Sequence, residues 1–343
     1  MMDMTVDFDV DRFLIRCPIW ANDVVRAMPS CRWSKARRAW AAAPTRKNLE
    51  YMRRNLLQGK LAEFTSAAME AMDRIEREQT NKTKMIARGV SFPPWYKFKT
   101  QPRKHQAQGL NKFYGSDNFA LFMDRGTGKT KTIIDMSCAW RMEGKIDALL
   151  VVCKLSVRRT WKEEFEEHAP IEASVFLPDT TKGKALNRWL SESHDFRVMV
   201  VGTESLSQGQ MSKIAERFLL AHPKAMMAID ESHMIATHRA ARSVACVGLG
   251  RKAICRAVLS GTPISTGPMN LFMQFEFLDP DIIGIGDYYA FRNRYAVMGG
   301  YRDDKGRPLQ IVGYQNIDEL TATVAPYVFE VRKSDVLDLP PKV

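Results

Sequence analysis

The sequence lacks the features that mark secreted, zinc-stabilised or membrane-spanning proteins. Its 343 residues include six cysteines, but no Cys-x-x-Cys pair. In the absence of such a pair, we expect isolated, reduced thiols and no zinc site. No stretch approaches the roughly 20 apolar residues that span a bilayer. Residues 1–10 hold three aspartates but no basic residue, so we expect a cytoplasmic protein that is not secreted and has no membrane partner.

Positive charge is concentrated in the first third of the chain. The formal net charge is +12 at pH 7. Residues 1–110 hold 21 lysines and arginines against 11 acidic residues, whereas the remainder holds 30 against 28. Such a distribution suits a polyanionic partner, although basic proteins are often merely soluble.

Residues 1–58 are predicted to form a small basic α+β module. Residues 7–15 alternate as a strand does, and prolines break the following region into short pieces. Between residues 26 and 54, nine basic residues accompany one acidic residue and the aromatic Trp33 and Trp40. Such a mixture can bind phosphates and stack on bases, but the tryptophans can equally anchor a core. We expect core tryptophans, with nucleic-acid contacts made by Arg32, Lys35, Arg37 and Arg38.

The rest of the chain divides into a linker and a larger domain. Residues 59–95 are predicted to be a helical linker, because apolar residues recur at helical spacing over residues 61–75. Over residues 96–343, strand-like runs alternate with helical segments, which indicates an α/β fold with a parallel sheet covered on both faces. The predicted strands are 119–122, 148–152, 197–201, 225–229 and 257–259, and the predicted helices are 129–141, 161–167, 184–191 and 211–221.

Residues 126–130, Gly-Thr-Gly-Lys-Thr, lie between a predicted strand and a predicted helix. Glycine permits the positive φ and close backbone approach that a phosphate needs, and a helix N-terminus adds exposed N–H groups. Lys129 would reach the β- and γ-phosphates, and the Thr130 hydroxyl would ligate magnesium. The strict pattern has glycine where this chain has Met123, so an ordinary strand–turn–helix is the alternative. We expect a nucleotide-binding loop comprising Gly126, Thr127, Gly128, Lys129 and Thr130.

Residues 230–233, Asp-Glu-Ser-His, follow an apolar strand-like run. Ligands of parallel sheets bind beyond the carboxyl ends of the strands. There Asp230 can hold magnesium, directly or through water, and Glu231 can orient and deprotonate an attacking water. The alternative is a polar strand end with exposed carboxylates, which the upstream Lys129 disfavours.

A third string, Ser-Gly-Thr-Pro at residues 260–263, follows where nucleic-acid motors place a coupling element. With these three strings in order, residues 96–343 resemble the first RecA-like lobe of superfamily 2 helicases, specifically the Swi/Snf-like DNA translocases. Residues 102–106, Pro-Arg-Lys-His-Gln, are similar to the adenine-reading Q motif. The resemblance implies that Gln106 and Arg103 read the base, and that Ser260 and Thr262 couple the phosphate site to DNA.

Further segments match the family pattern, and one segment differs from it. Residues 151–161 are similar to motif Ia, and residues 200–205 to the next DNA-contacting segment. Residues 270–271, 277–280, 333–336 and 339–342 follow the Swi/Snf pattern rather than that of DEAD-box RNA helicases. Where the family has Asp-Glu-Met before the first loop glycine, this chain has Met-Asp-Arg. The resemblance implies DNA-backbone contacts by Lys154, Ser156, Arg158 and Thr203.

Residues 13–57 are more weakly similar to the HARP domain of annealing helicases. The similarity is carried by Met28-Pro29-Ser30, Trp33, Arg38 and Trp40. It implies that residues 1–58 help to bind branched or forked DNA.

The resemblance implies the ATP-binding lobe of a DNA-dependent ATPase, a duplex-DNA translocase or annealing helicase that uses ATP and Mg²⁺ and is associated with DNA. In the family, Leu-Pro-Pro-Lys leads into a second RecA-like lobe with arginine fingers, and this sequence ends at Val343. We expect that lobe in cis or in trans. Since an arginine finger is worth roughly 10³–10⁵ in rate, we expect slow hydrolysis by this chain alone.

Three alternatives stay open at this point. The first is an RNA helicase. The second is a DNA-binding module whose ATP site is a switch or a relic, without motor activity. A P-loop kinase is more distant, because it would leave the later motifs unexplained.

Overall fold

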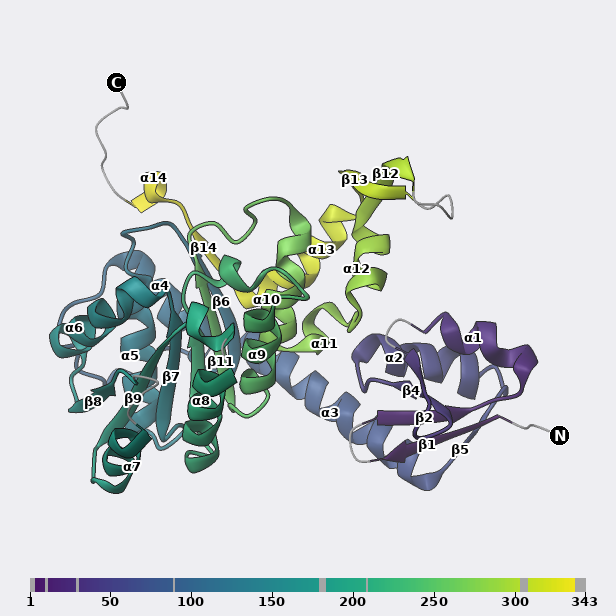
Figure 1. The fold of residues 1–343 in the computed structure, drawn as a ribbon, viewed down its shortest axis with the longest axis horizontal. Coiled ribbons are helices and arrows are strands. Elements are labelled where there is room, and N and C mark those ends of the chain that lie inside the picture. Colours follow the sequence, from purple (N-terminus) through teal and green to yellow (C-terminus); the bar gives the residue numbers. More distant parts are fainter. Residues whose placement is uncertain are drawn as a thin grey trace. The chain divides into compact units, whose positions relative to one another are not determined.

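The computed structural model describes residues 4–9, 12–28, 31–88, 90–178, 183–207, 209–302 and 308–336. The chain divides into two compact units (Figure 1). Unit 1 combines Met1–Ala87 with Asp279–Thr323, and unit 2 combines Arg88–Leu278 with Val324–Val343. Residues 279–323, assigned by the sequence to the nucleotide-binding lobe, thus group with the N-terminal residues. The physical reason is that their described part adds no strand to the large sheet of unit 2.

Unit 2 is built on a seven-stranded sheet of order β14-β6-β11-β10-β7-β9-β8. Each of these pairings is parallel, which confirms the predicted RecA-like architecture. The strands are β6 (Asn118–Met123), β7 (Ala148–Cys153), β8 (Ala173–Phe176), β9 (Phe196–Gly202), β10 (Met226–Ile229), β11 (Cys255–Ser260) and β14 (Val328–Val331). The sequence analysis missed β8 and β14. Both are short strands at the ends of the sheet and lack a fully buried apolar run.

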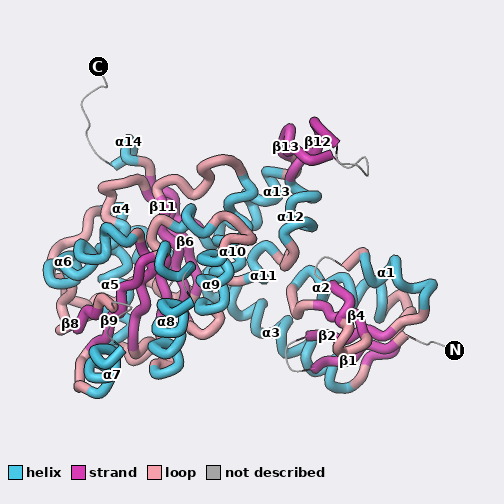
Figure 2. Tube along the Cα trace, in the orientation of Figure 1, coloured by secondary structure: helices cyan, strands magenta, loops and turns pink. Residues whose placement is uncertain are grey.

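Helices pack on both faces of this sheet, as Figure 2 shows in cyan against the magenta strands. They are α4 (Lys104–Phe113), α5 (Lys129–Met142), α6 (Arg158–His168), α7 (Gly183–Ser191), α8 (Gly209–Ala221), α9 (Ala241–Gly250), α10 (Leu271–Leu278) and α14 (Lys333–Val336). Short 3₁₀ turns are η3 (Leu155–Val157), η4 (Glu204–Ser207), η5 (Ser232–Ile235), η6 (Pro268–Asn270) and η7 (Ala325–Tyr327). The four predicted helices correspond to α5–α8. Trp140 of α5 and both Trp161 and Phe165 of α6 belong to the core formed with the strands.

The N-terminal part of unit 1 is an α+β module with a five-stranded sheet of order β3-β4-β2-β1-β5. Its elements are β1 (Thr5–Asp9), β2 (Arg12–Arg16), η1 (Ile19–Ala21), α1 (Asn22–Arg26), β3 (Cys31–Ser34), β4 (Ala39–Ala42), α2 (Arg46–Tyr51), the π-helix η2 (Met52–Leu57), β5 (Glu63–Phe64) and α3 (Ser66–Arg88). The single strand predicted over residues 7–15 is wrong, because β1 and β2 pair antiparallel. The predicted linker helix begins later than expected, since residues 63–64 instead pair with β1.

The second part of unit 1, for which the sequence analysis named no elements, is a compact insertion between α10 and β14. It contains α11 (Pro280–Ile283), α12 (Tyr288–Tyr295), β12 (Ala296–Arg302), β13 (Pro308–Tyr314) and α13 (Ile317–Val324). Strands β12 and β13 form a two-stranded antiparallel sheet. Asp287 caps α12 by accepting a hydrogen bond from the Ala290 N–H at 2.9 Å. Arg294 of α12 pairs with Glu319 of α13, which joins the two helices.

Three further properties bear on function. Among the described residues, no helix is long and apolar enough to cross a membrane. The same part of the chain holds no group of three or more His, Cys, Asp or Glu residues that could by itself hold a metal ion. All six cysteines lie in the described ranges and are free. Burial raises the pKa of the Cys246 thiol to about 12, so this thiol stays protonated at neutral pH.

Candidate nucleotide-binding site

The glycine-rich loop joins the end of β6 to the start of α5. Gly126 and Gly128 have φ values of 80° and 86°, so both adopt the left-handed conformation that the sequence predicts. Gly128 is also the residue at which α5 is capped. A Cβ atom at Gly128 would lie 1.9 Å from Gln106 Nε2, so a larger residue there would force the Gln106 amide to move.

Lys129 begins α5 and is buried against the loop. Its Nζ donates to the backbone oxygens of Met123 at 2.8 Å and Asp124 at 3.3 Å. Burial lowers the pKa of Lys129, and the nearby carboxylates of Glu231 and Asp230 oppose this shift. The ammonium is therefore held at the loop, facing the acidic pair, as a phosphate-binding lysine must be.

Two threonines complete the loop in different ways. The Thr127 hydroxyl donates to the Asp124 carbonyl at 2.6 Å and closes the turn. Thr130, the second residue of α5, is half-buried and keeps its hydroxyl near the start of the helix. The structure thus gives Thr127 a role in shaping the loop, while the role of Thr130 as a magnesium ligand stays a prediction.

Asp230 lies directly after β10, and its carboxylate is fixed by two hydrogen bonds. Its Oδ2 accepts from the Trp161 indole N–H at 3.1 Å, and its Oδ1 accepts from the Glu231 backbone N–H at 2.9 Å. Burial raises the pKa of Asp230, because the charged form is desolvated. A bound cation favours the ionised carboxylate, so this position suits a metal ligand.

Glu231 has a φ of 49°, an unusual conformation for a residue other than glycine. Its carboxylate contacts the Arg125 guanidinium and the His233 ring. Oε1 is 3.7 Å from Arg125 Nε, and Oε2 is 3.3 Å from His233 Nδ1. The contact with His233 lacks hydrogen-bond alignment, and Oε2 has no hydrogen-bond partner among the described residues. One oxygen of the predicted water-activating carboxylate is therefore buried and accepts no hydrogen bond from the described residues.

The third string lies next to the second. His233 Nδ1 is 3.3 Å from Ser260 Oγ, which accepts a hydrogen bond from the Thr262 N–H at 3.1 Å. A second link runs through α10, where Gln274 accepts from the Ser232 hydroxyl at 2.6 Å and donates to the Pro263 carbonyl at 2.9 Å. Ser260 is thus linked to Glu231 through His233, and Thr262 is linked to it through His233 and Ser260.

Gln106 connects α4 to the phosphate loop. Its Oε1 accepts from the Arg103 N–H at 2.7 Å, and its Nε2 donates to the Thr127 and Gly128 carbonyls at 3.4 and 3.3 Å. The neighbouring His105 ring also contacts the Thr127 carbonyl, at 2.7 Å. Arg103 is exposed at the start of α4. The role of Gln106 and Arg103 in reading the base stays a prediction, while the contact of Gln106 with the loop is structural.

Comparison with known proteins decides the family. Residues 105–343 match the model of the SNF2-related domain. The chain belongs to the SNF2-related domain family. It is similar to the DNA annealing helicase and endonuclease ZRANB3 of Mus musculus, with 30% identity over 256 residues, 72% of this chain and 22% of the relative.

Two more relatives of this SNF2-related chain support the same family. One is a SWI/SNF-related matrix-associated actin-dependent regulator of chromatin subfamily A-like protein 1 homolog of Caenorhabditis elegans, which is 27% identical over 69% of this chain and 32% of the relative. The other is the solved Sulfolobus solfataricus SWI2/SNF2 ATPase core in complex with dsDNA, with 25% identity and a TM-score of 0.54 over 73% of this chain and 49% of that chain. The SNF2-related chain spans no more than half the length of these relatives.

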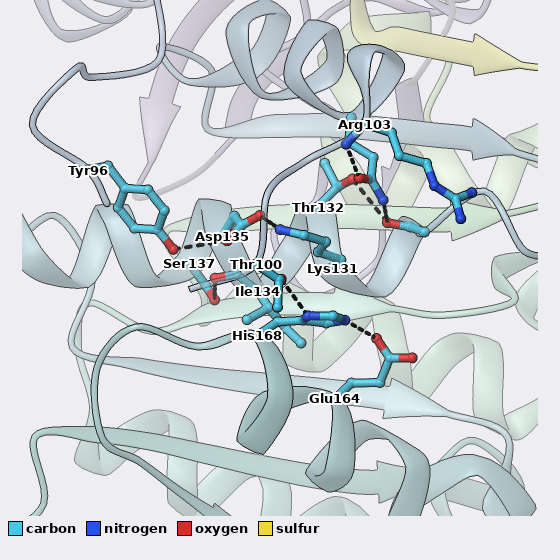
Figure 3. A network of polar contacts seen from close by, with 12 residues as sticks. Tyr96, Thr100, Arg103, Lys131, Thr132, Ile134, Asp135, Ser137, Glu164 and His168 are labelled. Atoms are coloured by element: carbon cyan, nitrogen blue, oxygen red, sulfur yellow. Dashed lines mark hydrogen bonds and ion pairs between the residues drawn. The ribbon is translucent and has the colours of Figure 1, made fainter. Parts of the chain in front are cut away.

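A buried polar network lies behind the loop of this SNF2-related lobe (Figure 3). Lys131 and Asp135, one turn apart in α5, form a buried ion pair at 2.5 Å, and the Tyr96 hydroxyl donates to Asp135 at 3.1 Å. Burial raises the pKa of Asp135, and Lys131 opposes the shift. Beside it, His168 contacts Thr100 at 2.7 Å and Glu164 at 3.3 Å. The network fixes the segment before α4 against α5 and α6, and so supports the helix that carries Lys129.

The segments expected to touch DNA divide into exposed and buried side chains. Lys154 and Ser156 are exposed after β7. The Arg158 guanidinium instead donates to the Val200 and Pro178 carbonyls at 3.1 and 2.8 Å. Thr203 is fully buried, and its hydroxyl donates to the Cys153 carbonyl at 3.1 Å. Arg158 and Thr203 thus satisfy backbone carbonyls at or near the strand ends, and their contacts with DNA stay a prediction.

The basic residues of the N-terminal module differ in their surroundings. Arg32 pairs with Asp287 of the same unit, and Arg37 pairs with Asp9 at 3.2 Å. Lys35 and Arg38 are exposed on the turn between β3 and β4. These two are the best placed of the four for a polyanionic partner.

The two tryptophans of the module also differ. Trp33 is 52% exposed, so its predicted position as a core anchor is wrong, because β3 is an edge strand. Trp40, on the inner strand β4, is half-buried against the module core and donates its indole N–H to Asn22 at 3.0 Å. Of the motif residues predicted for this module and for the end of the chain, Pro29, Ser30 and residues 339–342 lie outside the described ranges.

Proposed function

We propose that this chain is the ATP-binding lobe of a DNA-dependent ATPase that translocates on duplex DNA. One observation carries the proposal. Lys129, Asp230 and Glu231 converge beyond the carboxyl ends of β6 and β10, and His233 links Glu231 to Ser260. This is the arrangement that phosphoryl transfer coupled to a second ligand needs, because positioning and charge neutralisation supply most of the catalysis.

The residues at this site fit a magnesium nucleotide. Lys129 would bind the β- and γ-phosphates. Thr130 and Asp230 offer hard oxygen donors, which magnesium prefers, and the cation would neutralise phosphate charge. Glu231 would hold the attacking water and take its proton on the buried Oε2. His233 contacts both Glu231 and Ser260, so a change in the contacts of Glu231 would be transmitted to Ser260 and Thr262. These two residues precede the loop leading to α10.

DNA is the partner that the comparisons support best. A solved relative is described in complex with dsDNA, and a curated relative is named a DNA annealing helicase. The excess of basic residues over residues 1–110 also favours a polyanion. We propose forked or branched DNA as the preferred structure, with a second RecA-like lobe, in cis or in trans, completing the ATPase site.

The test is ATP hydrolysis by the chain with duplex DNA, forked DNA or structured RNA. We expect slow hydrolysis that DNA stimulates more than RNA does, and loss of activity in Lys129→Ala and Glu231→Gln. Lys252→Ala, an exposed lysine paired with Glu216, is the matched control and should keep wild-type activity. Greater stimulation by RNA would support an RNA helicase. ATP binding without DNA-stimulated hydrolysis, even with a second lobe supplied, would support a switch.

A further inference from the structure

The phosphate loop carries a charged residue that the family pattern does not supply. Arg125 directly precedes Gly126, where the Swi/Snf-like pattern has methionine. Its side chain is 82% exposed, and its Nε lies 3.7 Å from Glu231 Oε1. Among the described residues, the acidic group paired with this guanidinium is the carboxylate that would activate water.

The surroundings of Arg125 place it at the junction of the three catalytic strings. Its positive charge lowers the pKa of Lys129, so both cations act on the same region of the site. A Cβ atom at Gly261 would lie 3.3 Å from the Arg125 backbone nitrogen, so the third string packs directly on this part of the loop. On the other side of Glu231 lies His233. Arg125 and His233 thus contact different oxygens of the Glu231 carboxylate, and the third string packs on the backbone beside Arg125.

Two features let the guanidinium move. Exposed ion pairs are weak, because water screens the charges and two long side chains lose freedom. The adjacent Gly126 has a φ of 80°, and a Cβ atom built there would meet no described atom within 4 Å. Breaking the ion pair between Arg125 and Glu231 therefore costs little, and the space beside Gly126 is open.

We propose that Arg125 is a phosphate-contacting residue that exchanges Glu231 for the terminal phosphate of bound ATP. A guanidinium is planar and always charged, and it pairs with phosphate oxygens through two parallel hydrogen bonds. Its departure leaves the Glu231 carboxylate to the attacking water. Arg125 thereby adds, from within this lobe, a positive charge where negative charge builds up during phosphoryl transfer. The inference rests on the proposed function, because it needs ATP at this site.

The test compares ATP with ADP, since only ATP has the terminal phosphate. Equilibrium titrations of the whole chain with each nucleotide in Mg²⁺ give both dissociation constants for the wild type and Arg125→Met. We expect the variant to bind ATP about tenfold to 100-fold more weakly, as for a lost charge-assisted hydrogen bond, and ADP within about twofold. Arg125→Lys should recover part of the loss. Arg188→Met is the matched control, because Arg188 is 84% exposed and also pairs with a glutamate through Nε.

The outcomes separate the two proposals. Wild-type protein that binds neither nucleotide would refute the proposed function and this inference together. Wild-type binding with an unchanged ratio of ATP to ADP affinity in Arg125→Met would refute the role of Arg125 alone. An equal loss for both nucleotides would also refute it, because that result indicates a distorted loop rather than a missing phosphate contact.

Discussion

Replacement of Gly128 by alanine tests the contact between the phosphate loop and Gln106. The new methyl group would have to occupy a residue with a φ of 86°, and its carbon would lie 1.9 Å from Gln106 Nε2. The Gln106 amide must therefore move away and give up its bonds to the Thr127 and Gly128 carbonyls. We expect Gly128→Ala to lower both the stability of the lobe and its affinity for ATP.

The magnitude follows from two contributions. The left-handed conformation costs an alanine roughly 1–2 kcal/mol. Loss of the two buried hydrogen bonds of Gln106 adds about 0.5–1.5 kcal/mol each. The free energy of unfolding should therefore fall by about 2–5 kcal/mol. Gly144→Ala, at a φ of 73° with no described atom within 4 Å of its Cβ position, should show the conformational cost alone.

Urea unfolding followed by tryptophan fluorescence measures both variants, since Trp140 and Trp161 are buried in the same unit. The double variant Gly128→Ala with Gln106→Ala separates the contributions, because the obstructing amide is gone. In that background the alanine should cost only about 1–2 kcal/mol. Equal losses in Gly128→Ala and Gly144→Ala, or an unchanged cost without Gln106, would refute the reasoning.

Two further predictions concern buried carboxylates. Asp135→Asn leaves Lys131 buried without its counter-ion, so the free energy of unfolding should fall by about 3–5 kcal/mol in urea; a loss below about 1 kcal/mol would contradict this. Burial raises the pKa of Asp230, so the wild type loses stability from this group as pH rises through that raised pKa. The melting temperature of Asp230→Asn relative to wild type should therefore increase from about pH 4 upward, and a pH-independent difference would show that Asp230 is not the cause.

The sequence predicts the central strands of unit 2 well, because each is a short apolar run buried on both faces. The outer strands β8 and β14 were missed, since half-exposed edge strands carry no such run. The hairpin of β1 and β2 was read as one strand because alternation continues through it. Local sequence patterns thus predict strands that are buried on both faces, but they do not define the bounds of strands at the edge of a sheet.

The candidate site was predictable where its residues are adjacent in sequence. Gly126 to Thr130 and Asp230 with Glu231 form contiguous strings whose chemistry is visible without a structure. The bond from Trp161 to Asp230 joins residues 69 positions apart, and the Lys333 N–H donates to Asp124 across 209 positions. No local pattern signals such contacts, because they depend on strand order.

The sequence also does not predict the direction in which a side chain points. Arg158 and Thr203 follow the carboxyl ends of β7 and β9. Their donors nevertheless point to backbone carbonyls, because the ends of β7 and β9 need these hydrogen bonds. A motif therefore locates a segment more reliably than it assigns the role of each side chain.

The most direct test of the account is a titration of the whole chain with ATP in Mg²⁺, compared with Lys129→Ala. The account predicts saturable binding of one ATP by the wild type. It also predicts an affinity at least about tenfold weaker in the variant, since a buried charged contact to phosphate is lost. Absence of ATP binding by the wild type, or equal affinities for the two proteins, would contradict the assignment of this loop as the nucleotide site.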